Sequence, residues 1–136
     1  PTVSISPSEI NFGDIPAGNA RPGYYEKTRP FTVTYGLVKQ GNGSDCGTEP
    51  MLATFSTTNT IQESAIILPQ PDSGFGIAIS PNASMHPLIE MNAPIHFKLA
   101  TGATLASTYT AGLLWLSRTP KLGPFSATAK ITVTFE

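Results

Sequence analysis

The side chains best suited to chemistry in this chain are one cysteine, two histidines and nine carboxylates. Cys46 lies in a glycine-rich stretch, residues 41–47, with no His or Lys beside it to lower its thiol pKa. His86 and His96 lie in separate segments and do not form a metal-ligand spacing. The chain also lacks a Gly-x-Ser-x-Gly motif and a phosphate-binding glycine loop. We therefore expect no enzymatic activity, no cofactor and no metal.

Cys46 is the only cysteine, so it has no partner for a disulfide within this sequence. Two interpretations stay open. The thiol is either inert and partly buried, or it is bonded to a cysteine outside these 136 residues.

Three aromatic residues are candidates for a sugar-binding surface: Tyr24, Tyr25 and Trp115. Aromatic residues of a β-sandwich more often belong to its core or rim. Binding of a receptor or carbohydrate by a β-sandwich adhesin module is therefore kept as the alternative to the function that the terminal strands suggest below.

The composition limits the classes of protein to which the chain can belong. With 136 residues and 14.4 kDa, it is expected to form one domain, residues 1–136. A net charge of −1 without basic clusters argues against nucleic acid as a partner. The 40% hydrophobic content excludes a disordered chain, and no apolar run reaches the roughly 20 residues of a membrane span. Thirteen prolines and twelve glycines favour turns over helices, which predicts an all-β fold.

Alternating apolar residues predict six or seven short strands in an antiparallel sandwich of immunoglobulin type. We expect a first strand over residues 2–15, kinked at Pro7, and a loop over residues 16–30. The further predicted strands are Phe31–Tyr35, Met51–Thr57, Ala65–Leu68, Gly74–Ile79, Ile95–Leu99 and Phe125–Phe135, with a short edge segment at Pro87–Met91. Residues 101–122 are not assigned, although Ala111–Leu116 is compatible with a strand or a helical turn.

The predicted last strand places small and large apolar residues on one face. Thr128, Lys130, Thr132 and Thr134 alternate with them on the other face. The apolar face consists of Ala127, Ala129, Ile131, Val133 and Phe135. Chain ends are usually polar and frayed unless something holds them. A large apolar side chain next to the final Glu136 therefore suggests that this strand packs against something.

Three segments together resemble the chaperone–usher pilins of bacterial fimbriae. Gly123 is fourteenth from the end and Phe135 is penultimate, which is similar to the C-terminal signature of that family. The opening strand, residues 2–6 followed by 10–15, resembles the kinked first strand of these subunits. The Gly-apolar-Gly-apolar segment Gly74–Ile79 resembles an interior strand common in them.

The resemblance implies an incomplete immunoglobulin-like sandwich of six main strands that lacks its seventh and is completed by a donor strand. Gly123 would let the backbone turn into the last strand, or would be a plain turn glycine before Pro124. Glu136 would carry the terminal carboxylate that a chaperone anchors. The groove that receives the donor strand would be lined by Val3, Ile5, Ile10, Phe12, Ala127, Ala129, Ile131, Val133 and Phe135.

The resemblance also implies the partners and the location of the protein. A periplasmic chaperone would first lend a strand, and the N-terminal extension of a neighbouring pilin would then replace it during assembly at the outer-membrane usher. The protein would pass through the periplasm to a fimbrium on the cell surface, with contact to a host receptor through another domain. Burying about four or five apolar side chains at roughly 1.5–3 kcal/mol each gives a gross gain on the order of 6–15 kcal/mol, comparable to the net stability of a domain.

Two features depart from the family pattern. The family usually has a disulfide from the start of the first strand to the second strand or just beyond; Cys46 is near the latter position, but residues 1–6 contain no cysteine. No alternating extension precedes the first strand, and the N-terminus does not look like a signal peptide, which we expect to have been removed. Either such an extension was removed as well, or this is the second domain of a tip adhesin.

Overall fold

The computed structural model describes residues 1–38, 47–121 and 123–136. Cys46 lies outside these ranges. The described residues form strands and loops with one short 3-10 helix, η1 (Ala17–Asn19). No helix in this part of the chain is long and apolar enough to cross a membrane.

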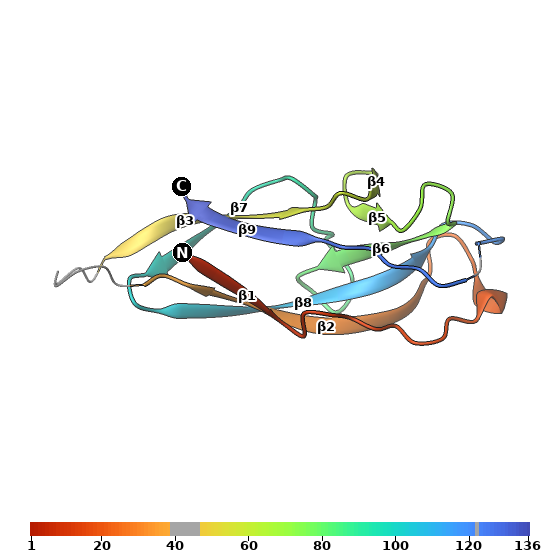
Figure 1. Ribbon diagram of the computed structural model, residues 1–136, viewed down its shortest axis with the longest axis horizontal. Coiled ribbons are helices and arrows are strands. Elements are labelled where there is room, and N and C mark those ends of the chain that lie inside the picture. The colour runs from red at the N-terminus through yellow and green to blue at the C-terminus, as the bar shows by residue number, and fades with distance from the viewer. Residues whose placement is uncertain (39–46, 122) are drawn as a thin grey trace.

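Two antiparallel sheets form the molecule (Figure 1). The six-stranded sheet has, in spatial order, β1 (Thr2–Ser6), β2 (Tyr25–Gly36), β8 (Thr104–Trp115), β6 (Phe75–Ser80), β5 (Ile66–Leu68) and β4 (Thr60–Gln62). The three-stranded sheet has β7 (Ile95–Ala100), β3 (Thr48–Ser56) and β9 (Lys130–Phe135). The predicted antiparallel sandwich is therefore present, with more strands than the sequence pattern indicated.

The core lies between the two sheets and is rich in aromatic rings. Alternation along β2 buries Phe31 and Tyr35, as the period of a strand requires. The ring of Tyr109 in β8 stacks on Phe31 at a centroid distance of 5.7 Å and meets Phe55 of β3 edge-on at 5.3 Å. Tyr109 thus joins the two sheets through offset and edge contacts, the geometries that aromatic pairs prefer.

The two predicted terminal strands are shorter than expected. The first ends at Ser6 instead of continuing to residue 15, because Pro7 has no N–H to continue the ladder with β2. The last begins at Lys130 instead of Phe125, where the ladder with Ser56 of β3 ends. Within the described ranges, residues 7–15 and 123–129 therefore belong to no strand.

The two longest strands, β2 and β8, were largely missed by the sequence pattern. β2 begins at Tyr25, inside the predicted loop, and a register shift between Tyr25 and Lys27 interrupts the alternation there. β8 is buried on both faces from Tyr109 to Trp115, so its apolar residues run without alternation and do not distinguish a strand from a helix. The predicted edge segment at Pro87–Met91 is not a strand, and the short β4 was not predicted.

Candidate functional site

The two terminal strands are free edges of different sheets. β1 has β2 as its one sheet neighbour and β9 has β3, and the two strands lie along the same side of the molecule (Figure 1). No backbone pairing joins β1 to β9 among the described residues. The sandwich is therefore open along this side, with a row of backbone N–H and C=O groups on each margin.

A groove with a volume of about 1150 Å³ lies in this opening. Its first wall is Ile5 with residues 7–15, and its second wall is residues 123–129 with Ile131. Pro120 and Lys121 also line it. The floor is apolar and consists of Phe31, Phe55, Ile67, Phe75, Ile77, Ile79, Ala111, Leu113 and Trp115. The groove therefore gives access to the core that the two sheets share.

The backbone of β9 alternates between its partner strand and the groove. The N–H of Glu136 donates to the carbonyl of Pro50 in β3 at 3.0 Å. Successive residues of a strand direct their backbone groups to opposite edges, so the even-numbered residues of β9 bond to β3. The odd-numbered residues Ile131, Val133 and Phe135 direct theirs to the free edge. An incoming strand would find an unpaired ladder there.

The first wall is held to the sheet by a side chain in place of strand pairing. The ammonium of Lys27 in β2 donates to the carbonyls of Phe12 at 3.0 Å and Asp14 at 3.2 Å. Gly13 has φ +71°, a left-handed conformation that favours glycine, and its N–H donates to Asn11 Oδ1 at 2.7 Å. The segment therefore keeps a fixed shape along the groove although it lies outside any sheet.

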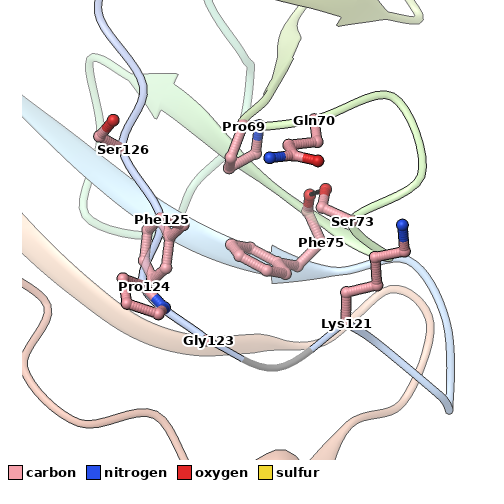
Figure 2. A pocket seen from close by; sticks show the side chains of 9 residues that line it. All are labelled: Pro69, Gln70, Ser73, Phe75, Lys121, Gly123, Pro124, Phe125 and Ser126. Atoms are coloured by element: carbon pink, nitrogen blue, oxygen red, sulfur yellow. Dashed lines mark hydrogen bonds between the residues drawn. The ribbon is translucent and has the colours of Figure 1, made fainter.

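Aromatic packing and an ion pair lie where the groove adjoins a smaller hollow that shares residues 123–126 with it. Figure 2 shows the ring of Phe125 beside Phe75, with a centroid distance of 4.8 Å. They line a smaller hollow of about 520 Å³. Lys121 lies 2.5 Å from Asp72, and this contact lowers the pKa of the exposed Asp72 carboxyl. Gly123 has φ +125°, and no atom lies within 4 Å of where its Cβ would be, so backbone conformation rather than crowding favours glycine there.

The structure places six of the nine residues expected along a donor-strand groove in the lining of this groove: Ile5, Ile10, Phe12, Ala127, Ala129 and Ile131. Val3 and Val133 are half-buried and pack against the core beside it. Phe135 lies beyond the groove with 54% of its surface exposed. Glu136 is exposed, and its side chain contacts Nδ1 of His96 in β7.

The aromatic surface proposed for sugar binding is not formed. Trp115 is only 3% exposed and belongs to the groove floor, because it follows Leu113 on the inner face of β8. Tyr24 is 61% exposed and stacks under Arg21, whose guanidinium carbon is 5.2 Å from the ring centroid. In the part of the chain that is described, no three His, Cys, Asp or Glu residues gather as a metal site would need.

Most of the floor was not found from the sequence. Phe75, Ile77 and Ile79 were recognised as one face of a strand, and the structure places that face in the groove. Phe31, Phe55 and Leu113 come from three other strands, and no local pattern separates them from ordinary core residues. Only the opening between the two sheets distinguishes them.

Comparison with known proteins agrees with this architecture. Residues 2–136 match the model of a family described as fimbrial protein. No curated protein sequence matches the chain.

Solved structures with a similar fold include pilus proteins. The P pilus rod subunit PapA is 18% identical with a TM-score of 0.71, and 98% of this chain covers 99% of that one. A chaperone–usher pilus subunit is 20% identical with a TM-score of 0.69, covering 98% of this chain and 87% of that one. The CupB6 tip adhesin from Pseudomonas aeruginosa is 16% identical with a TM-score of 0.55, and the match covers 98% of this chain and 41% of that one. These similarities confirm the immunoglobulin-like sandwich.

Proposed function

The chain belongs to the fimbrial protein family, and on that premise we propose that its groove accepts a β-strand from another protein. One observation carries the proposal: an apolar groove opens onto the core, with Ile5 of β1 in one wall and Ile131 of β9 in the other, and these two strands do not pair among the described residues. The protein is accordingly a pilin domain whose role is structural assembly rather than catalysis.

A single added strand would pair with the free backbone groups of this open side and cover its apolar floor. Its backbone would pair with the free edge of β9, and its alternate side chains would cover the apolar floor. Chaperone–pilin complementation is a known case of such strand addition, so the mechanism is taken from that precedent. The directions of the odd-numbered residues of β9 support it, because their N–H and C=O groups face the free edge and one of these residues, Ile131, lines the groove.

We propose two successive strand donors. A periplasmic chaperone would supply the first strand, and the N-terminal extension of a neighbouring subunit would replace it when the subunit is assembled at the outer-membrane usher into a fimbrium on the cell surface. The similarity to PapA, a rod subunit, and to CupB6, a tip adhesin, fits either position in a pilus. In a tip protein, a further domain would contact the host receptor.

The end of β9 is arranged so that a chaperone could reach it. Phe135 is 54% exposed and Glu136 is exposed, so neither must leave the core to contact another protein. We propose that Phe135 packs on the chaperone while the terminal carboxylate of Glu136 is anchored by basic residues of the chaperone.

A peptide titration tests the proposal. A peptide of alternating apolar and polar residues, long enough to span the groove, should raise the free energy of unfolding by about 2.7 kcal/mol at a concentration of about 100 Kd. The measurement is thermal unfolding with and without peptide. A scrambled peptide of the same composition, with its alternation broken, should have no effect. Stabilisation by glycans and indifference to the alternating peptide would contradict strand acceptance and favour a carbohydrate-binding module.

A further inference from the structure

The free edge of the second wall continues beyond the β3–β9 ladder. The last pair of that ladder is Ser56 with Lys130, after which β3 turns away towards β4. Ala127 and Ala129 nevertheless line the groove in the same phase as Ile131. There, side chains rather than a neighbouring strand bond to the backbone.

Two side chains of the β3–β4 turn occupy the place of the missing strand. The hydroxyl of Thr57 donates to the carbonyl of Thr128 at 2.5 Å. The N–H of Thr128 donates to Asn59 Oδ1 at 3.2 Å. Both backbone groups of Thr128 are therefore bonded on the β3 side, as they would be inside a regular ladder.

The side chains of Thr57 and Asn59 are themselves held by further hydrogen bonds to both sheets. The N–H of Asn59 donates to Thr57 Oγ1 at 3.0 Å, which orders the turn after β3. The side-chain Nδ2 of Asn59 donates to the carbonyl of Leu68 in β5 at 3.2 Å. The position of Thr128 is thus set by groups from the three-stranded and the six-stranded sheet together.

With Thr128 bonded towards β3, the backbone groups of its neighbours must point the other way. Ala127 and Ala129 then direct their N–H and C=O groups into the groove, in continuation of those of Ile131. We propose that Thr57 and Asn59 are positioning residues that lengthen the strand-receiving edge from Ile131 to Ala127. This inference rests on the proposed strand acceptance and specifies how far the acceptor edge extends.

The test compares two alternating peptides on variants of Thr57. The long peptide reaches Ala127, and the short one ends opposite Ile131. Thr57→Val removes the hydroxyl with little change in shape, whereas Thr57→Ser retains it. We expect Thr57→Val to weaken binding of the long peptide about three- to tenfold, the effect of one lost hydrogen bond, and to leave the short peptide unchanged. Thr57→Ser should bind both as the unsubstituted protein does.

Amide hydrogen exchange on the unsubstituted protein gives a second readout that does not depend on any variant folding. The amides of Ala127 and Ala129 should exchange slowly with the long peptide bound and rapidly with the short one.

Three results would overturn the inference: equal weakening of both peptides by Thr57→Val, no weakening of either, or rapid exchange of Ala127 and Ala129 under the long peptide. If neither peptide binds the unsubstituted protein, the proposed strand acceptance itself fails, and the inference with it.

Discussion

The two alanines of the second wall show how side-chain size controls access to the groove. Ala129 is exposed, Ala127 is half-buried and packs against the core, and both line the groove. The space above them is therefore available to a partner and contributes nothing to the packing of the isolated protein. Substituting such residues should change the affinity for a partner more than the free energy of unfolding.

Replacing Ala129 by phenylalanine should block the groove. The ring would occupy space that an inserted side chain needs, so we expect affinity for the long alternating peptide to fall at least about tenfold. The midpoint of thermal unfolding without peptide should stay nearly unchanged. Trp115, the only tryptophan, lies in the floor, so its fluorescence can report the titration.

Thr132→Phe is the matched control, because it adds the same ring to the exposed outward face of β9. It should bind the peptide normally. Equal binding by Ala129→Phe and the unsubstituted protein would show that this part of the groove is not used.

Among the elements, the first wall is unusual in being positioned by a side chain instead of a ladder. Residues 7–15 leave the sheet after β1, and Lys27 binds the carbonyls of Phe12 and Asp14. Lys27 lies at the register shift near the start of β2, between Tyr25 and Lys27. A side chain of one strand thus holds a wall formed by another segment.

Lys27→Met should loosen the first wall. Methionine keeps an apolar stem but leaves both carbonyls without their donor, so we expect the free energy of unfolding to fall by about 1 kcal/mol and peptide affinity to fall about three- to tenfold. Denaturant unfolding and the fluorescence titration measure the two effects. Lys27→Arg retains a donor and should restore most of the affinity. If Lys27→Met bound the peptide as tightly as the unsubstituted protein, the wall would not depend on this contact.

For the whole molecule, the aromatic core links the two sheets and makes stability depend on pH in the alkaline range. The hydroxyl groups of Tyr35 and Tyr109 lie 3.5 Å apart inside the core. Burial first, and then the contact with Tyr109, raises the pKa of Tyr35 well above its usual value near 10. Above pH 10 the unfolded chain releases a proton that the folded protein keeps. Stability should therefore fall as the pH rises above 10, by up to about 1.4 kcal/mol per pH unit for this group.

Tyr35→Phe should make the protein less sensitive to alkali. At pH 8 the variant should be less stable by about 0.5–1.5 kcal/mol, because the hydroxyl of Tyr109 loses its partner. At pH 11 the difference should shrink or reverse, since the phenylalanine has no proton to lose. Urea unfolding at both pH values measures this. The same difference at pH 8 and pH 11 would show that Tyr35 is not responsible for the alkaline loss.

The sequence by itself determined the fold class and the residues of the terminal strands that face inward. Alternation is a local property, so Val3 and Ile5 could be assigned to one face of β1, and Ile131 and Val133 to one face of β9, without any knowledge of their neighbours. Composition favoured turns over helices and argued against nucleic acid as a partner in the same local way, because it depends only on which residues are present.

Tertiary structure alone decided where those strands end and what lies between them. Pairing is a property of two segments, so alternation alone could not show that β9 starts at Lys130, where the ladder with Ser56 ends. It also could not show that Lys27, Thr57 and Asn59 stand in for absent neighbours, because each bonds to backbone groups distant in the chain. A groove is made of such non-local relations, and it exists only once both sheets are in place.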